Sequence, residues 1–178
     1  MNWRTLATAL TALVSLNAHA DLKVGDLAPD FTTQAALGGK TYSYSLRDAL
    51  KNGPVVLYFY PAAFTSGCTI EAHDFAEAIE KYQALGASVI GVSHDEIDIL
   101  KRFSVSECRS KFPVAADADG SIMKAYDAVM PMFSQYASRT SYVIAPDGRI
   151  VYAYSSLSPS KHVANTLAAV EKWKDGQH

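Results

Sequence analysis

Two stretches of the chain are rich in apolar, β-branched and aromatic residues. They span residues 55–60 and 88–93, and runs of this kind are typical of strands covered on both faces, as in the middle of a parallel or mixed sheet. Between them, residues 68–85 carry apolar side chains at helical spacing, and Gly86 supplies the glycine that commonly ends a helix. The pattern therefore predicts two buried strands joined by an amphipathic helix.

Shorter elements are predicted around this centre. The remaining strands are residues 30–34, 41–44 and 112–115, with a hairpin of residues 140–145 and 149–155 around a Pro-Asp-Gly turn; the remaining helices are residues 46–51, 95–103, 121–126 and 160–174. The last helix is amphipathic, and its predicted inner face carries Val163, Leu167 and Val170. This order predicts an α/β, thioredoxin-like fold with a mixed central β-sheet and helices on both faces.

The first twenty residues have the pattern of a cleavable export signal. Arg4 gives a positive start, residues 6–16 are mostly apolar, and Ala18-His19-Ala20 presents small residues at the positions that a signal peptidase reads. We expect cleavage after Ala20, a mature domain of residues 21–178, and a periplasmic or secreted protein. The alternative is a membrane anchor, but the apolar run is well short of the ~20 residues that span a bilayer, so no stable membrane association is expected.

Charge and composition narrow the possible partners. The whole chain has a formal net charge of −2, and loss of Arg4 with the leader makes it −3. This small charge, spread along the chain, argues against a nucleic-acid partner. The five histidines share no metal-ligand spacing with each other or with the cysteines, so neither a metal nor another cofactor is expected. A monomer and a homodimer both remain open.

Only two cysteines are present, Cys68 and Cys108. Export would place them in a compartment where disulfides persist. One interpretation is a structural disulfide, worth roughly 4 kcal/mol in the chain-entropy model. The other is a redox-active pair. The number of cysteines is compatible with both interpretations, so the choice between them depends on the residues around each cysteine.

The surroundings of Cys68 favour the redox interpretation. Cys68 lies at the start of the helix that directly follows the buried strand. Unpaired N–H groups and the positive end of the helix dipole favour an anion there, and the thiolate is the reactive form of cysteine. Thr65 or Ser66 is placed to cap the helix, and the Thr65 hydroxyl could also face a ligand beside the sulfur. The alternative is that Cys68 only fills space under the strand.

The motif Pro61-x-x-x-Thr65-x-x-Cys68, extended by Glu71, resembles the active-site signature of the peroxiredoxins. The segment VVLYFYPAAFTSGCTIEA is similar to the bacterioferritin-comigratory-protein, or peroxiredoxin Q, branch of that family. The similarity continues through VIGVSHD, KFPVAAD, SRTSYVIAPDGRIV and the last helix, and covers nearly all of residues 21–174.

The resemblance implies a reaction and a set of roles. A thiol peroxidase of this type reduces hydrogen peroxide and organic hydroperoxides through a sulfenic acid, and a thioredoxin-like thiol donor regenerates it. Cys68 would be the peroxidatic nucleophile, Thr65 would hydrogen-bond the peroxide, and Pro61 would shield the sulfur from water. Arg139 matches the family's active-site arginine, and Glu71 would orient it through a bidentate pair. Without the resemblance, Arg139 would be a solvated residue at the hairpin edge.

One position departs from the pattern of many members of this branch. They carry a second cysteine five residues after the first, where this chain has His73. Others place the resolving cysteine in the next helical region, so Cys108 is the candidate resolving residue here; the alternative is a one-cysteine enzyme resolved by an external thiol. His73 itself is expected to be a surface residue.

Two other functions are compatible with a thioredoxin-like fold that carries two cysteines. A thioredoxin-like disulfide reductase or isomerase would carry a Cys-x-x-Cys pair, but the positions three residues from Cys68 hold Thr65 and Glu71. A non-enzymatic, disulfide-stapled binding domain would use the two cysteines only as a staple, and such a pair would resist both reductant and peroxide.

Overall fold

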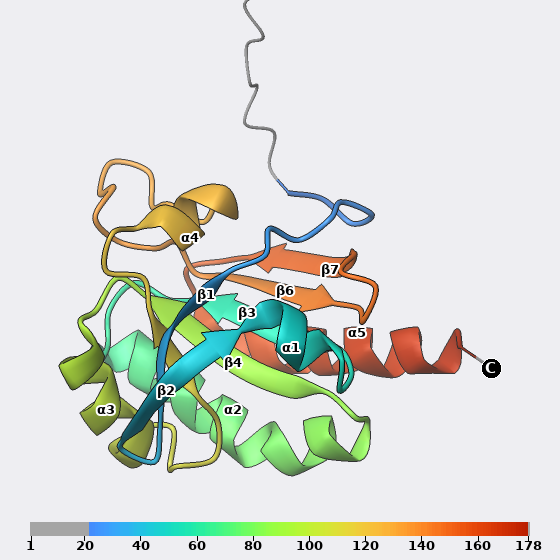
Figure 1. The fold of residues 1–178 in the computed structure, drawn as a ribbon, viewed down its shortest axis with the longest axis horizontal. Coiled ribbons are helices and arrows are strands. Elements are labelled where there is room, and N and C mark those ends of the chain that lie inside the picture. Colours follow the sequence, from blue (N-terminus) through green and yellow to red (C-terminus); the bar gives the residue numbers. More distant parts are fainter. Residues whose placement is uncertain (1–21, 178) are drawn as a thin grey trace, which may run out of the picture.

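The computed structural model describes residues 22–177 and contains a seven-stranded mixed sheet (Figure 1). The predicted leader and its cleavage site lie outside the described residues. The order of the strands across the sheet is β2-β1-β5-β4-β3-β6-β7. The strands are β1 (Thr32–Leu37), β2 (Lys40–Ser45), β3 (Val55–Phe59), β4 (Ser88–Ser93), β5 (Val114–Ala116), β6 (Thr140–Ile144) and β7 (Ile150–Ser155).

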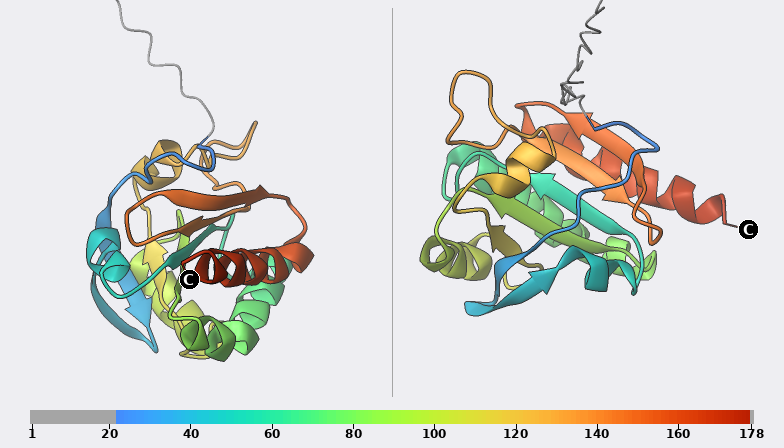
Figure 2. Two further views of the ribbon diagram at one scale, coloured as in Figure 1. Left: turned by 90° about the vertical axis from the view of Figure 1, so that its right-hand side faces the viewer. Right: turned by 45° about the horizontal axis from the view of Figure 1, so that its top comes forward.

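Helices cover both faces of this sheet, as predicted. The helices are α1 (Leu46–Leu50), α2 (Ser66–Ala84), α3 (Ile97–Ser106), α4 (Ser121–Ala125), the 3₁₀ turn η1 (Pro159–Lys161) and α5 (His162–Asp175). One apolar cluster joins α2, α3 and α5 to one face of the sheet, and a second joins α1 and α4 to the other face. Figure 2 shows α5, in red, lying along α2, in green.

The centre of the sheet has the predicted mixed character. β3 pairs in parallel with β4 and antiparallel with β6, while β4 pairs in parallel with β5. All residues of β3 and β6 are buried, in agreement with the apolar run that predicted β3. Phe59 at the end of β3 pairs with Thr140 at the start of β6. The loop before α2 follows the end of β3, and Arg139 precedes the start of β6. Both therefore lie at the same end of this antiparallel pair of strands.

A close contact between the two central strands holds α2 in place. Tyr58 of β3 pairs with Gly91 of β4, and its ring stacks on Phe75 of α2 with a centroid distance of 4.3 Å. A Cβ atom on residue 91 would lie 2.7 Å from Tyr58 Cζ, closer than atoms in a packed core can approach. The glycine therefore makes room for the ring on which α2 packs.

The element ends differ in places from the sequence expectation. α3 begins at Ile97, two residues later than predicted, and extends to Ser106. The delay has a physical cause, because the carboxylate of Asp95 accepts hydrogen bonds from Ser93 Oγ and from the backbone N–H of Ala63. Asp95 therefore holds the loop before α2 in place and is not part of helix α3.

The inner face of α5 also differs from the expectation. The fully buried positions are His162, Thr166 and Val170, while Val163 and Leu167 are only partly buried. The buried stripe is therefore rotated by one residue and contains two polar side chains. Of the helices in residues 22–177, none is long and apolar enough to cross a membrane.

Candidate active site

The loop that leads into α2 places Cys68 in the first turn of the helix. Thr65 is the N-cap residue, and the backbone N–H of Thr69 makes the first helical bond, to Thr65 O at 2.9 Å. The N–H groups of Ser66, Gly67 and Cys68 precede that bond, and helix geometry gives them no intrahelical acceptor. Cys68 is only 2% exposed, so these donors and the helix dipole act on a sulfur largely removed from water.

Thr65 occupies the predicted cap position, but its side chain does not cap the helix. Its Oγ donates to the carbonyl oxygen of Ala62 at 2.9 Å, and Ser66 is the first helical residue. Thr65 is therefore the N-cap residue, as predicted, but without a side-chain cap, and Ser66 is not the cap. The Thr65 hydroxyl oxygen keeps lone pairs that can accept a hydrogen bond. Pro61, directly after the buried Tyr60, is half-buried.

Arg139 connects Cys68 to two other elements. Its Nη2 lies 3.4 Å from Cys68 Sγ, its Nη1 donates to Glu71 Oε2, and its Nε donates to the carbonyl oxygen of Leu157 at 3.0 Å. Arg139 is 5% exposed, so it is not a solvated residue at the hairpin edge. The expected bidentate pair with Glu71 is also wrong, because the second terminal nitrogen faces the sulfur instead of the carboxylate.

The electrostatics of this group are dominated by burial. Glu71 is fully buried, and burial raises its pKa to about 8 although the positive charge of Arg139 lowers it. Burial alone would lower the pKa of Arg139, but the charges of Glu71 and Cys68 outweigh that effect and raise it. The guanidinium therefore stays charged beside the sulfur.

Gly67 determines how closely Arg139 can approach. A Cβ atom on residue 67 would lie 3.2 Å from Arg139 Nη2, which is tighter than an ordinary contact. The absence of a side chain at this position therefore leaves space for the guanidinium next to Cys68.

Cys108 lies just beyond the end of α3 and is fully buried. It belongs to the same apolar cluster as Cys68, and both cysteines are free thiols. Burial, followed by the negative charge of Glu107, raises the pKa of Cys108 well above its ordinary value. The next two residues, Arg109 and Ser110, have left-handed φ angles of 51° and 56°, which are unfavourable for residues other than glycine.

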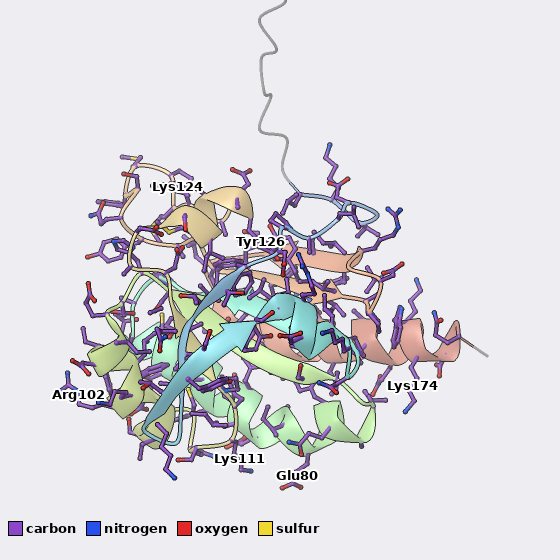
Figure 3. All side chains as sticks on the ribbon, in the orientation of Figure 1. Glu80, Arg102, Lys111, Lys124, Tyr126 and Lys174 are labelled. Carbon is purple, nitrogen blue, oxygen red and sulfur yellow. The ribbon has the colours of Figure 1, made fainter. Side chains whose placement is uncertain are left out.

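Three side-chain contacts join α2 to residues 107–111, two of them ion pairs and the third a contact between a histidine and a carboxylate. We call this set the ion-pair ladder; it consists of His73–Glu107 at 2.9 Å, Glu77–Arg109 at 3.2 Å and Glu80–Lys111 at 3.9 Å. Figure 3 shows the Glu80 and Lys111 side chains next to each other. His73, expected to be a surface residue, has a side chain that is 35% exposed and contacts Glu107. The ladder holds the segment that contains Cys108 against the helix that contains Cys68.

A buried histidine completes the surroundings of Glu71, and the sequence interpretation missed it. His162, the first residue of α5, is fully buried; its Nδ1 lies 2.7 Å from Ser141 Oγ and 3.8 Å from Glu71 Oε1. A signal was present in the sequence, because His162, Thr166 and Val170 recur at the i, i+4, i+8 spacing of a buried helix face. Within residues 22–177, no cluster of three or more His, Cys, Asp or Glu side chains is suited to hold a metal.

Comparison with known proteins agrees with this geometry. Residues 24–153 match the AhpC/TSA family. The chain is 36% identical over 148 residues to a chloroplastic peroxiredoxin Q of Triticum aestivum, covering 83% of this chain and 66% of the relative. It is 32% identical over 168 residues to a chloroplastic peroxiredoxin Q of Populus jackii, covering 94% of this chain and 76% of that one.

Solved structures give the same result. The crystal structure of the peroxidoxin BcpB from Mycobacterium tuberculosis superposes with a TM-score of 0.77 at 30% identity, covering 85% of this chain and 97% of that one. A mutant of the Xylella fastidiosa PrxQ superposes with a TM-score of 0.76 at 25% identity, covering 86% and 98% of the two chains. The chain therefore belongs to the AhpC/TSA family and, within it, to the peroxiredoxins of the peroxiredoxin Q type.

Proposed function

We propose that the protein is a thiol peroxidase that reduces hydrogen peroxide and organic hydroperoxides to water and alcohols, with Cys68 as the nucleophile. The observation that carries the proposal is the position of the sulfur, 3.4 Å from Arg139 Nη2 at the N-terminus of α2. The names of its relatives support the same activity.

The proposed first step transfers one oxygen atom to sulfur. The thiolate attacks one oxygen of the hydroperoxide, the O–O bond breaks, and the leaving oxygen takes up a proton. The thiol and the hydroperoxide thus become a sulfenic acid and an alcohol, or water when the substrate is hydrogen peroxide. Sulfur is oxidised by two electrons and the peroxide is reduced by two.

Ionisation of the thiol cannot supply most of the rate. About 3% of an ordinary thiol is ionised at neutral pH, so full ionisation gains only about 30-fold. The rest must come from donors that stabilise the stretched O–O bond in the transition state. Arg139 and the N–H of Cys68 are proposed for this role. The hydroxyl of Thr65, whose hydrogen is donated to Ala62 O, is proposed to accept a hydrogen bond from the bound hydroperoxide. Glu71 is proposed to orient Arg139, and Pro61 to exclude water.

Cys108 is the proposed resolving cysteine. Its thiol would condense with the Cys68 sulfenic acid to form a disulfide and release water, and a thioredoxin-like or other dithiol donor would then reduce that disulfide. Because Cys108 is buried and its pKa is raised, it must leave the core before it can react. We assign this local opening to residues 107–111, because the backbone at Arg109 and Ser110 is strained and the Glu77–Arg109 pair faces solvent.

The decisive experiment mixes the reduced protein with one equivalent of hydrogen peroxide in a stopped-flow instrument and maps the products by non-reducing peptide mass spectrometry. The parent should consume the peroxide and form a Cys68–Cys108 disulfide. Cys68→Ser should fold but leave the peroxide intact, and peroxide turnover near the parent rate in this variant would refute the proposal.

The matched variant Cys108→Ser separates the two possible cycles. It should complete the first turnover and then accumulate sulfenic acid, which excess peroxide oxidises to sulfinic acid. A lasting Cys68 sulfenic acid beside an unmodified Cys108 in the parent would instead establish a one-cysteine enzyme resolved by an external thiol.

Export is a separate part of the proposal and rests on the pattern of residues 1–20. The mature protein, beginning at Asp21, would act in the periplasm or outside the cell with a thiol donor of the same compartment. Fractionation of bacteria that produce the full chain, with N-terminal sequencing of the product, tests this. Uncleaved protein found only in the cytoplasm would contradict it.

A further inference from the structure

The peptide unit between Ala62 and Ala63 is hydrogen-bonded at both of its polar groups. Its N–H donates to Asp95 Oδ2 at 2.8 Å, and its carbonyl oxygen accepts from Thr65 Oγ at 2.9 Å. In a trans peptide these two groups lie in one plane and point in opposite directions. The peptide unit therefore connects a carboxylate that follows β4 to the hydroxyl group of the residue that begins α2.

The end groups of this chain determine the direction of each hydrogen bond. A carboxylate and a carbonyl oxygen only accept, and an amide N–H only donates. The Thr65 hydroxyl group therefore gives its one hydrogen to Ala62 O, and its oxygen can only accept from any further partner. A hydroxyl group without this bond could rotate and donate to a thiolate or to a substrate. The bond to Ala62 thus determines how Thr65 contacts a hydroperoxide.

The charge of Asp95 strengthens this arrangement. A hydrogen bond to an ionised group is roughly twice as strong as a neutral one, and hydrogen bonds in a chain polarise one another. A negative charge beside the N–H shifts electron density to the carbonyl oxygen of the same peptide, so Ala62 O becomes a better acceptor for Thr65. The buried Ser93 donates to the same Asp95 oxygen at 2.7 Å and helps to fix its position.

The backbone between the two hydrogen bonds is strained. Phe64 has a left-handed φ of 64°, which is an outlier for a bulky residue. Its ring packs edge-on against Phe103 of α3, with 5.2 Å between the ring centroids. Strained backbone persists only where several contacts hold it. The bond to Asp95 before Phe64 and the bond from Thr65 after it are two of these contacts, so Asp95 helps to keep the Thr65 hydroxyl group in place.

We propose that Asp95 is a positioning residue, which acts through the Ala62–Ala63 peptide to make Thr65 Oγ an acceptor-only group for the hydroperoxide. A thiolate attacks the terminal oxygen of a hydroperoxide, and Thr65 Oγ accepts the hydrogen that this oxygen carries. The S–O bond forms, the O–O bond breaks, the hydrogen stays on the transferred oxygen, and the leaving oxygen takes a proton from water. The proposal deepens the peroxidase function and rests on it for this effect on the rate.

The chain of hydrogen bonds can be tested without peroxide. In NMR spectra of the reduced, nitrogen-15-labelled protein, the Ala63 amide proton should resonate at low field, as expected for a charge-assisted bond. Asp95→Asn keeps an acceptor oxygen but removes the charge, so this resonance should move to higher field. Thr65→Val removes the donor at the other end of the peptide and should move the resonance in the same direction.

Glu96→Gln is the matched control for the loss of charge. Glu96 follows Asp95 directly, is exposed, and makes no side-chain cap bond to α3, so this change should leave the Ala63 resonance where it is. The NMR result also separates the two proposals. A protein that showed these shifts but consumed no peroxide would refute the peroxidase function and leave the hydrogen-bond chain standing.

The rate of reaction with hydrogen peroxide tests the effect on catalysis. Asp95→Asn should lower the second-order rate constant by roughly fivefold, as expected when one charge-assisted hydrogen bond becomes neutral. Because Asp95 acts through the Thr65 hydroxyl group, the same change should have no further effect in the slower variant Thr65→Val. Glu96→Gln should keep the rate of its background in both cases.

A reagent without a hydroperoxide group separates positioning from general damage to the site. Methyl methanethiosulfonate reacts with the Cys68 thiolate and has no O–H or N–H group that Thr65 could accept. Asp95→Asn should therefore react with it at the parent rate, as followed by mass spectrometry of the peptide that contains Cys68. A loss of rate as large as that with peroxide would mean that Asp95 only maintains the shape of the loop, and would refute the positioning role.

Three further results would overturn the proposal. They are an Ala63 resonance that does not move in Thr65→Val, a peroxide rate in Asp95→Asn equal to that of the parent, and an effect of Asp95→Asn that is equally large with and without Thr65→Val. If Asp95→Asn does not fold, the Ala63 resonance in Thr65→Val still decides whether the two ends of the peptide are coupled.

Discussion

At the scale of single residues, Arg139 divides its donors among three partners. The planar fork contacts the Cys68 sulfur, the Glu71 carboxylate and the carbonyl oxygen of Leu157. A lysine could place one charge near the sulfur but could not make these three contacts in one plane. The approach of the fork also depends on Gly67, which carries no side chain to obstruct Nη2.

The change Gly67→Ala tests that approach. The added methyl group should displace Arg139 Nη2 from the sulfur and lower the second-order rate constant with hydrogen peroxide several-fold, measured by stopped-flow mixing. Stability to urea should be kept or increase by up to about 1 kcal/mol, because alanine is favoured over glycine in a helix. Gly176→Ala, at the end of α5 and with only ordinary contacts, is the matched control. Equal rates in both variants would show that the close approach does not matter.

The sequence predicted which residues come together at the site, but it predicted the contacts between them less well. Spacing and resemblance singled out Cys68, Glu71 and Arg139, because a motif records which residue types occur together. A motif does not specify how side chains are oriented. It therefore could not indicate that one guanidinium nitrogen faces the sulfur, which leaves only the other terminal nitrogen for Glu71. His162 was missed because it is far away in sequence and comes next to Glu71 only when α5 packs on α2.

At the scale of secondary structure elements, side-chain contacts between α2 and residues 107–111 hold the segment that contains the buried Cys108. The ion-pair ladder holds this segment from the solvent side, while left-handed backbone at Arg109 and Ser110 opposes the closed arrangement. Exposed ion pairs are individually weak, at ~0.2–1 kcal/mol each. The closed segment is therefore held mainly by the burial of Cys108 and its neighbours.

The change Glu107→Gln should make the segment open more readily. It removes the charge that faces His73 and the negative charge that raises the pKa of Cys108. The Cys68–Cys108 disulfide should then form about two- to fivefold faster after a pulse of peroxide, as measured by rapid acid quenching and mass spectrometry. Asp98→Asn is the control, because Asp98 pairs with Lys101 within α3. Slower disulfide formation in Glu107→Gln would mean that Glu107 assists resolution instead of restraining it.

Elements with long apolar runs were predicted most accurately. β4 was located to the residue, and the start of α2 was placed only two residues late. The beginning of α3 was also displaced by two residues, here because Asp95 bonds to Ala63, a contact distant in sequence. The local pattern of apolar residues determines whether a segment forms a helix or a strand, whereas tertiary contacts determine the residues at which it begins and ends.

At the scale of the whole molecule, a titratable carboxyl group lies inside the apolar packing between α2, α5 and the sheet. Burial raises the pKa of Glu71 in the folded state to about 8 from an ordinary value of 4.5. Between these two values the folded protein holds a proton that the unfolded chain has lost. Stability must therefore decrease as pH rises through this window.

The predicted decrease can be measured by urea unfolding between about pH 6.5 and 8, and the matched curve of Glu71→Gln removes the contribution of the histidines, which titrate near pH 6.5. The contribution of Glu71 should lower the free energy of unfolding by up to ~1.4 kcal/mol per pH unit. Glu71→Gln cannot ionise and should show a flatter dependence over the same range. A parent curve as flat as that of the variant would mean that Glu71 is already ionised in the folded state.

The burial of both cysteines in one apolar cluster also has a consequence for the redox equilibrium of the protein. If Cys108 must leave this cluster to form the disulfide, its packing stabilises the dithiol form relative to the disulfide form. Each ~1.4 kcal/mol of packing lost on opening then raises the reduction potential of the Cys68–Cys108 couple by ~30 mV. A thiol donor would therefore reduce such a disulfide readily. Substitutions within the apolar cluster that contains Cys108, such as at Phe112, should therefore change the reduction potential without replacing either cysteine.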